Sequence, residues 1–463
     1  MINYLQVENL TKSYGDLVLF DNISFTIGEG QRIALIGRNG SGKTTLLNIL
    51  AGKDTADSGT ITPRRDLRIA YLEQNPEYAA DLTVLEACFR SDNPALRAIA
   101  AYEQAVADPA QDGLQEAMSR MDALAAWDYE QRAKEILSRL KINDFDKKIG
   151  QLSGGQLKRV ALAAVLISEA DLLILDEPTN HLDLDAIAWL EEFLINFENT
   201  VIVVSHDRYF LNKVCTHTAD IDYGKIQLYA GNYDFWYKTS QLIARQQREQ
   251  NKKAEQRAKE LKEFIARFSA NASKSKQATA RKKELENLTI NDIKVSSRKY
   301  PYINFKYDRE IGNDILFVEN LTKEGYFENL SFTVNRDEKI GIVGKNSKAI
   351  TMLYDILTGN ETATSGYFKW GKTIIPTYLP QNNDRYFVGC DLNLVDWLSR
   401  FSYDHYEEFV RGWLGRMLFS GEESQKKASV ISGGERVRCM LAKMMLEGGN
   451  FMILDEPTNH LDL

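Results

Sequence analysis

Residues Gly37–Thr44 have the pattern of a phosphate-binding loop, Gly-x-x-x-x-Gly-Lys-Thr. Glycines allow successive backbone N–H groups to converge on an anion. Lys43 is expected to reach the β- and γ-phosphates of ATP, and the Thr44 hydroxyl is expected to hold Mg²⁺. A strand predicted at Arg32–Ile36 and a helix predicted at Thr44–Leu50 flank the loop, so a simple Gly-rich turn is the weaker interpretation. The residues expected to bind the nucleotide here are Gly37, Asn39, Gly40, Ser41, Gly42, Lys43, Thr44 and Thr45.

An acidic pair, Asp176 and Glu177, ends a predicted buried strand at Leu172–Asp176. A carboxylate at the end of a strand suits Mg²⁺, and the next acid can polarise the water that attacks ATP. A solvated turn is the usual interpretation of an Asp-Glu pair, but the strand and the phosphate loop favour a catalytic one. The eleven residues around the pair, ILDEPTNHLDL, occur twice, at Ile174–Leu184 and Ile453–Leu463. The repeat predicts two related nucleotide-handling halves.

A short motif before a predicted helix suggests the family. Leu152–Gln156 reads LSGGQ and resembles the signature of ATP-binding cassette (ABC) proteins. Its backbone amides and serine at a helix N-terminus make a second anion site. The resemblance implies that this site caps the γ-phosphate held by the other half. The residues concerned are Ser153, Gly154, Gly155 and Gln156.

Three further positions take their roles from the same resemblance. His206 follows a predicted strand at Val201–Val204 and corresponds to the family's switch histidine. Gln74 corresponds to the glutamine that links Mg²⁺ to the attacking water. Tyr14 stands where the family stacks an aromatic ring on adenine, with a core tyrosine as the alternative. The predicted catalytic residues are therefore Lys43, Gln74, Glu177 and His206, and the predicted Mg²⁺ ligands are Thr44, Gln74 and Asp176.

The second half is altered at its phosphate loop. Residues 344–381 align without a gap with residues 37–74, so Gly344–Thr351 is the second loop. Ser347 and Ala349 replace glycines and Ile350 replaces the lysine, so the loop loses its fixed charge and part of its backbone freedom. This half also lacks an obvious adenine-stacking aromatic, and we expect weak nucleotide binding and little turnover. Its assigned residues are Gly344, Asn346, Thr351, Gln381, Asp455 and Glu456, with Ser432, Gly433, Gly434 and Glu435 as its signature.

The pairing of the halves also follows from the resemblance. ABC halves pair head to tail, so the first phosphate loop is expected to work with Ser432–Glu435, and the second with Ser153–Gln156. Hydrolysis is expected mainly at the first composite site. The chain ends at Leu463, directly after the second repeat, and we expect a fragment of a longer protein. The strand that precedes His206 in the first half would have no counterpart, which would leave a central gap and unpaired strand edges.

Composition places the chain among ordinary soluble proteins. It has 44% hydrophobic and 26% charged residues, and no apolar stretch long enough for a membrane span. Four scattered cysteines, Cys88, Cys215, Cys390 and Cys439, indicate reduced thiols and a cytoplasmic protein. The net charge is −8, yet residues 238–299 contain 17 Lys and Arg against 7 Asp and Glu. A basic segment on an acidic body predicts contact with nucleic acid.

The basic segment itself predicts a helical hairpin. A long helix is expected at Thr239–Ser269 and a returning helix at Gln277–Leu288, with Leu261 and Phe264 on an apolar stripe between them. A solvated charged linker is the alternative, but the one-sided charge favours contact with phosphates. The cations assigned to nucleic acid are Lys274, Lys276, Arg281, Lys282 and Lys283.

Two cassettes with a basic hairpin between them and no membrane segment resemble the ABC-F family. Up to about Leu184 the chain resembles its Uup-like subgroup and afterwards its YbiT-like subgroup, so we hypothesise a recombination or assembly joint at the repeat. The resemblance implies an α/β fold with two tandem phosphate-loop domains, each with a parallel-sheet core and antiparallel β and helical subdomains. We expect these domains at residues 1–237 and 301–463, a hairpin linker at 238–300 and a short helical arm around 93–139.

The ABC-F resemblance also implies a function. The expected protein is a Mg²⁺-dependent ATP hydrolase, a monomer with intramolecularly paired domains. It would bind the tRNA exit site of the ribosome, where the linker reaches rRNA and P-site tRNA. Two other hypotheses stay open. One is a DNA-associated ATPase acting on branched or mobile-element DNA, and the other is a partly non-functional fragment.

Overall fold

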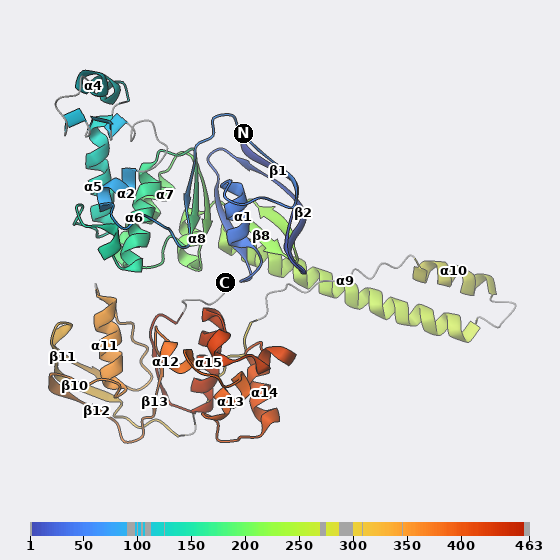
Figure 1. Ribbon diagram of the computed structural model, residues 1–463. Coiled ribbons are helices and arrows are strands. Elements are labelled where there is room, and N and C mark those ends of the chain that lie inside the picture. Colours follow the sequence, from blue (N-terminus) through green and yellow to red (C-terminus); the bar gives the residue numbers. More distant parts are fainter. Residues whose placement is uncertain are drawn as a thin grey trace. The chain divides into compact units, whose positions relative to one another are not determined.

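The chain divides into two compact units, Met1–Ser297 and Arg298–Asp462, and we describe each by itself as the first and the second unit (Figure 1). The computed structural model describes residues 2–89, 98–99, 101–102, 105–106, 113–124, 126–268, 275–286, 300–307, 309–344 and 346–457.

The first unit begins with a small antiparallel sheet. Its strands lie in the order β2 (Leu17–Gly28), β1 (Asn3–Tyr14) and β4 (Ser58–Pro63). Residues Leu5 and Val7 of β1 are buried and join a core that also contains residues of the phosphate-loop strand and of the helix after it. This sheet therefore packs over the element that presents the phosphate loop.

A larger sheet lies at the centre of the first unit and positions the site. Its strand order is β5-β6-β7-β3-β8-β9, and the pairs from β5 to β8 are parallel while β8 and β9 are antiparallel. Because β6 and β7 are buried along their whole length, their sequences are continuous apolar runs. The bounds are β3 Arg32–Gly37, β5 Ile69–Leu72, β6 Leu172–Asp176, β7 Thr200–Val204, β8 His217–Asp222 and β9 Lys225–Tyr229.

Helices complete the first unit. The signature helix α6 is almost entirely buried after its first turn, because its apolar residues pack in the core that also holds residues of α2 and α5. Cys88 and Cys215 are buried here and free. The helices are α1 Lys43–Leu50, α2 Val84–Phe89, α4 Leu114–Ala123, α5 Tyr129–Arg139, α6 Gly154–Ile167, α7 Leu184–Ile195 and α8 Arg208–Val214, with 3-10 turns at Ala126–Asp128 and Ile149–Gln151. The predicted arm corresponds to α4 and α5, and its part before residue 113 lies mostly outside the described residues.

The basic segment forms the predicted helical hairpin. Helix α9 (Tyr233–Phe268) extends from the first unit, and α10 (Ser275–Glu286) runs back along it (Figure 1). Leu261 is buried between the helices, and Arg257 of α9 donates hydrogen bonds of 2.7 and 3.0 Å to Glu284 of α10. The long helix begins earlier than the predicted Thr239, because its first turn packs into the core of the first unit.

The second unit repeats part of this plan. Its antiparallel sheet has the order β11-β10-β12, and a separate parallel pair joins β13 to β14. The strands are β10 Leu316–Lys323, β11 Phe327–Val334, β12 Ser365–Trp370, β13 Pro376–Leu379 and β14 Phe451–Leu454. The helices are α11 Ser347–Leu357, α12 Asp384–Phe387, α13 Leu394–Ser399, α14 Glu407–Arg416 and α15 Gly433–Leu446, with 3-10 turns at Gly421–Gln425 and Ala428–Val430.

The second unit differs from the first at the segment that corresponds to β3. Lys339–Gly344 corresponds to β3 but has no strand structure, and Ile340 and Val343 are 54% and 74% exposed. In the first unit β3 lies between β7 and β8, which both follow the acidic pair in sequence. Without such partners in the described part of the second unit, this segment has no ladder to join. The gap predicted at the counterpart of the strand before His206 is a different feature and stays a prediction.

We predict that Trp236 anchors the base of α9. Its ring is 4% exposed and its Nε1 donates a 2.9 Å hydrogen bond to Asp220 of β8, so Trp236→Ala should lower the local stability by about 3–5 kcal/mol. Hydrogen–deuterium exchange should accelerate in β8 and α8. The neighbouring Tyr237 is 37% exposed, and Tyr237→Ala serves as the control that should leave exchange near the wild-type rate. Equal protection of both variants would contradict the anchoring role.

Candidate nucleotide-binding sites

The first phosphate loop connects β3 to α1 and has the backbone shape that an anion requires. Gly40 and Gly42 adopt positive φ angles of 76° and 90°, which residues with a side chain rarely adopt. Gly42 is also the N-cap of α1 and provides no side-chain hydrogen bond to it. The first N–H groups of α1 therefore have no capping side chain and are suited to a phosphate.

Lys43 and Thr44 lie at the start of α1, next to the acids. The Lys43 ammonium donates a 2.8 Å hydrogen bond to the Gly37 carbonyl, so the side chain curls over the loop. The Thr44 hydroxyl donates a 2.8 Å hydrogen bond to Asp176 at the end of β6. The structure thus brings together Thr44 and Asp176, two oxygen donors that Mg²⁺ accepts as ligands.

The acidic pair is buried beside His206. Asp176 and Glu177 are 1% and 5% exposed. The His206 Nε2 lies 3.4 Å from Glu177 Oε1, and the His206 backbone N–H donates to Oε2 at 3.3 Å. Burial, with the charge of Asp176 as the second cause, raises the pKa of Glu177 to about 7. Burial also raises the pKa of Asp176, which the Thr44 hydrogen bond opposes.

Gln74 and Tyr14 lie at the edges of this site. Gln74 is exposed and follows β5, the strand paired with β6. Tyr14 ends β1 and is 54% exposed, so the alternative of a core tyrosine is wrong. The Lys12 ammonium lies 5.2 Å from the centre of the Tyr14 ring, and the Tyr14 hydroxyl donates a 3.0 Å hydrogen bond to Asp54. With the exposed Leu17 paired opposite in β2, the ring is suited to stacking on a base.

The signature of the first unit is an ordered helix start. Ser153 accepts a hydrogen bond from the Gln156 backbone N–H, and the Gln156 side chain accepts one from the Ser153 N–H, which forms a capping box. A Cβ on Gly155 would lie 3.2 Å from the Cβ of His181, whereas one on Gly154 would meet no atom within 4 Å. A side chain at Gly155 would therefore crowd His181 in the loop that follows the acidic pair.

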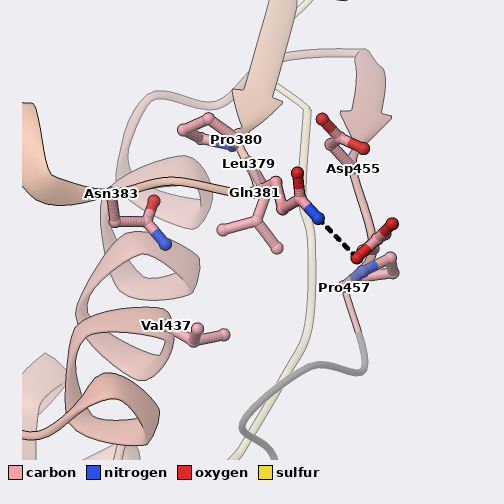
Figure 2. Close-up of a pocket in the computed structure, with 8 residues that line it drawn as sticks. Leu379, Pro380, Gln381, Asn383, Val437, Asp455 and Pro457 are labelled. Atoms are coloured by element: carbon pink, nitrogen blue, oxygen red, sulfur yellow. Dashed lines mark hydrogen bonds between the residues drawn. The ribbon is translucent and has the colours of Figure 1, made fainter. Parts of the chain in front are cut away.

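The acids of the second unit keep part of this geometry (Figure 2). Thr351 donates a 2.6 Å hydrogen bond to Asp455, as Thr44 does to Asp176. Gln381 donates a 2.6 Å hydrogen bond to Glu456, which is the dashed line in Figure 2, and both residues line a small cavity. Ser432 and Glu435 form a capping box at the start of α15, like the first signature.

The second phosphate loop has changed more than its sequence predicted. Helix α11 begins at Ser347, whereas α1 begins at Lys43, the position equivalent to Ile350. Asn346 caps α11 by accepting a 3.1 Å hydrogen bond from the Lys348 N–H. Residues without a strong preference for positive φ have replaced the glycines, so the anion-binding turn is now an extra turn of helix.

Sequence reasoning overlooked Tyr326 as an aromatic candidate of the second unit. Lys12 and Lys323 are equivalent, because each donates to a backbone carbonyl, Thr55 at 2.6 Å and Thr362 at 2.8 Å. Tyr326 lies three residues after Lys323, in the turn between β10 and β11, and is 40% exposed. The shortened hairpin moved the aromatic by one position, so the alignment that placed Tyr14 did not identify Tyr326.

The cations assigned to nucleic acid differ in how far the structure describes them. Arg281, Lys282 and Lys283 are exposed on α10, although Arg281 also forms an ion pair with Glu284. Lys276 lies on α10, and Lys274 lies outside the described residues. Lys282 and Lys283 are therefore the exposed pair on which a test can be built.

Comparison with known proteins identifies the family. A family model described as ABC transporter matches residues 20–180 and 327–459, and a second model with the same description matches residues 219–305. The chain is 50% identical to "Uncharacterized ABC transporter ATP-binding protein YkpA" of Bacillus subtilis, over 99% of this chain and 87% of that protein. It is 37% identical to "Probable ATP-binding protein YbiT" of Escherichia coli O157:H7, over 98% and 88%. It is 32% identical to "Energy-dependent translational throttle protein EttA" of Mycobacterium tuberculosis, over 99% and 84%.

These similarities run along both halves and the hairpin. Each alignment continues through the first repeat, where the joint between subgroups is hypothesised, and that joint stays a hypothesis. None of the described helices is long and apolar enough to cross a membrane. Domains of the matched family bind ATP, which agrees with the loop and acids described above. The chain belongs to the ABC-F type of tandem ABC ATPases, with two α/β nucleotide-binding domains joined by a helical linker region.

Proposed function

We propose that this protein is an ATPase that binds the ribosome and uses ATP binding and hydrolysis to modulate translation through its hairpin linker. Three observations support the proposal. The similarity to a protein named as an energy-dependent translational throttle covers 99% of the chain. Residues 238–299 hold 17 Lys and Arg against 7 Asp and Glu, a charge suited to RNA phosphates. Helix α9 is anchored in the unit that holds the intact phosphate loop.

The cluster of Thr44, Asp176, Glu177 and His206 carries the chemical part of the proposal. Bound Mg²⁺ would neutralise charge on the phosphates, and Thr44, Asp176 and Gln74 are the residues proposed to hold it. Lys43 would turn from the Gly37 carbonyl to the β- and γ-phosphates. Glu177 would accept the proton of the attacking water, with His206 fixing its carboxylate.

The proposed turnover is unequal between the two halves. The first loop, working with Ser432–Glu435 by family resemblance, would hydrolyse ATP. The second loop, working with Ser153–Gln156, would bind nucleotide weakly, since Ile350 carries no charge and the glycine turn has become helix. Tyr326 is our candidate for contact with the base in that half.

The connection between the first site and the linker is short. Helix α8 begins two residues after His206, and Asp207 caps it by accepting hydrogen bonds from the N–H groups of Tyr209 and Phe210. At the other end of α8, Asn212 accepts a 2.8 Å hydrogen bond from the Asp234 N–H in the first turn of α9. A movement of His206 toward a bound γ-phosphate would therefore be passed through α8 to the base of the linker.

We predict that Glu177→Gln traps an ATP-bound form that co-sediments with 70S ribosomes. Pelleting should require ATP and weaken with salt, because linker cations release counterions from RNA. In this background, Lys282→Ala/Lys283→Ala on α10 should weaken pelleting more than the control Lys252→Ala/Lys253→Ala, an exposed pair on α9. Pelleting without ATP dependence would contradict the proposal, and preferential binding of branched DNA would favour the DNA-directed alternative.

We predict that hydrolysis rises with pH through about 7. Glu177 acts as a base only when it is deprotonated, and its pKa is raised to about 7, so the single-turnover rate should fall as the pH drops from 8 to 6. The residual rate of Glu177→Gln, which lacks the titrating carboxyl group, should change much less. A flat profile for the wild-type chain would contradict the assignment of the base.

We predict that Asn212→Ala uncouples the linker from the nucleotide. ATP should slow hydrogen–deuterium exchange in the first turns of α9 in the Glu177→Gln background, and Asn212→Ala should abolish that effect while ATP still binds. Tyr209→Ala on the same helix, where Tyr209 is 69% exposed, is the control and should keep the effect. An unchanged response in Asn212→Ala would exclude this route.

A further inference from the structure

Lys158 is a buried lysine in the signature helix of the first unit. It lies in the second turn of α6 and is 7% exposed. Among the described residues it makes neither a hydrogen bond nor an ion pair within 4 Å. Burial lowers the pKa of Lys158, whereas the charges of Asp176 and Glu177 raise it, so the presence of a lysine at this position calls for an electrostatic reason.

The charges that face Lys158 are those of the acidic pair. The carboxylates of Asp176 and Glu177 are the groups whose charge acts on the Lys158 ammonium, and Lys158 acts in return on both of them. Lys43 is the other cation that acts on the pair. Two adjacent buried carboxylates thus share two lysines, one from the phosphate loop and one from the signature helix.

The second unit provides an internal comparison. Val437 follows Ser432 by five residues, as Lys158 follows Ser153. Val437 lines the small cavity that also contains Gln381, Asp455 and Glu456 (Figure 2). The equivalent position of α6 therefore lies against the acids of the first unit.

The same comparison argues against a purely structural role for the lysine. Val437 is 6% exposed, and α15 forms with this valine in place, so the position does not need a lysine for packing. The half with the intact phosphate loop has Lys43 and Lys158, whereas the altered half has Ile350 and Val437 at these two positions. Both cations near the acids are thus absent from the half whose loop is altered.

We propose that Lys158 is a positioning residue for ATP hydrolysis at the first site. Its positive charge holds the Glu177 carboxylate beside Asp176 when Lys43 is drawn away to the phosphates of ATP. The inference rests on the proposed function, in which Lys43 binds phosphates and Glu177 accepts a proton from water. Lys158 touches neither nucleotide nor water in this role, and it acts through Glu177.

Replacement by methionine separates charge from packing. Lys158→Met should lower the single-turnover hydrolysis rate by about tenfold or more, while the Kd for ATP changes by less than about threefold, since the side chain serves the reaction rather than binding. Lys158→Arg should restore most of the rate, because it restores the charge. Lys443→Met is the matched control and should keep the single-turnover hydrolysis rate near the wild-type value. Lys443 is also 7% exposed and lies on the other signature helix, where it pairs with Glu447.

A double variant tests whether the effect passes through Glu177. In the Glu177→Gln background, the Lys158→Met change should cause little further loss, because the charge it positions is already gone. A wild-type rate in Lys158→Met would overturn the inference, and so would Lys158→Arg being as slow as Lys158→Met. A further tenfold loss in the double variant would also overturn it. If the wild-type chain itself does not hydrolyse ATP, both the proposed function and this inference are overturned. If the wild-type chain hydrolyses ATP but the Lys158 variants behave as just described, only this inference is overturned.

Discussion

The burial of two adjacent carboxylates at the end of β6 is the constraint on which the first unit depends. Asp176 and Glu177 end a strand that is covered on both faces, so their charges cannot be solvated and need donors from the protein. Thr44 and His206 provide hydrogen bonds or close contact. Thr44 lies on α1 and His206 follows β7, the strand paired with β6, so the parallel sheet gathers the site at one edge.

The second unit keeps part of this arrangement and differs at its phosphate loop. Thr351 still donates to Asp455, but Glu456 is exposed and accepts a hydrogen bond from Gln381. The segment equivalent to β3 is irregular, so no strand presents the second phosphate loop. The extra helical turn at Ser347 replaces the phosphate-binding turn. A helix start needs only a cap, whereas a phosphate-binding turn needs glycines at positive φ.

Much of the first site could be predicted from sequence, because its motifs are contiguous and each has a mechanical reason. The loop at Gly37–Thr44 and the strand before Asp176 required only local spacing. Tyr326 escaped prediction because a shortened hairpin shifts the alignment, and Lys158 because the acids whose charges act on it lie at the end of another element. The early start of α9 escaped because Tyr233 and Trp236 are fixed by tertiary packing, which no helical period reveals.

The anchoring of α9 gives the linker a defined mechanical origin. A basic helix joined to its domain by a flexible segment would sample many directions, and its position would not report the state of the nucleotide. Here the first turn of α9 is held by Asn212 of α8 and by the buried ring of Trp236. Because α8 begins next to His206, a small displacement of the proposed catalytic residues would act at the base of a 36-residue helix and would be amplified along its length. Rigidity at the base is therefore what would allow hydrolysis chemistry to control a distant basic tip.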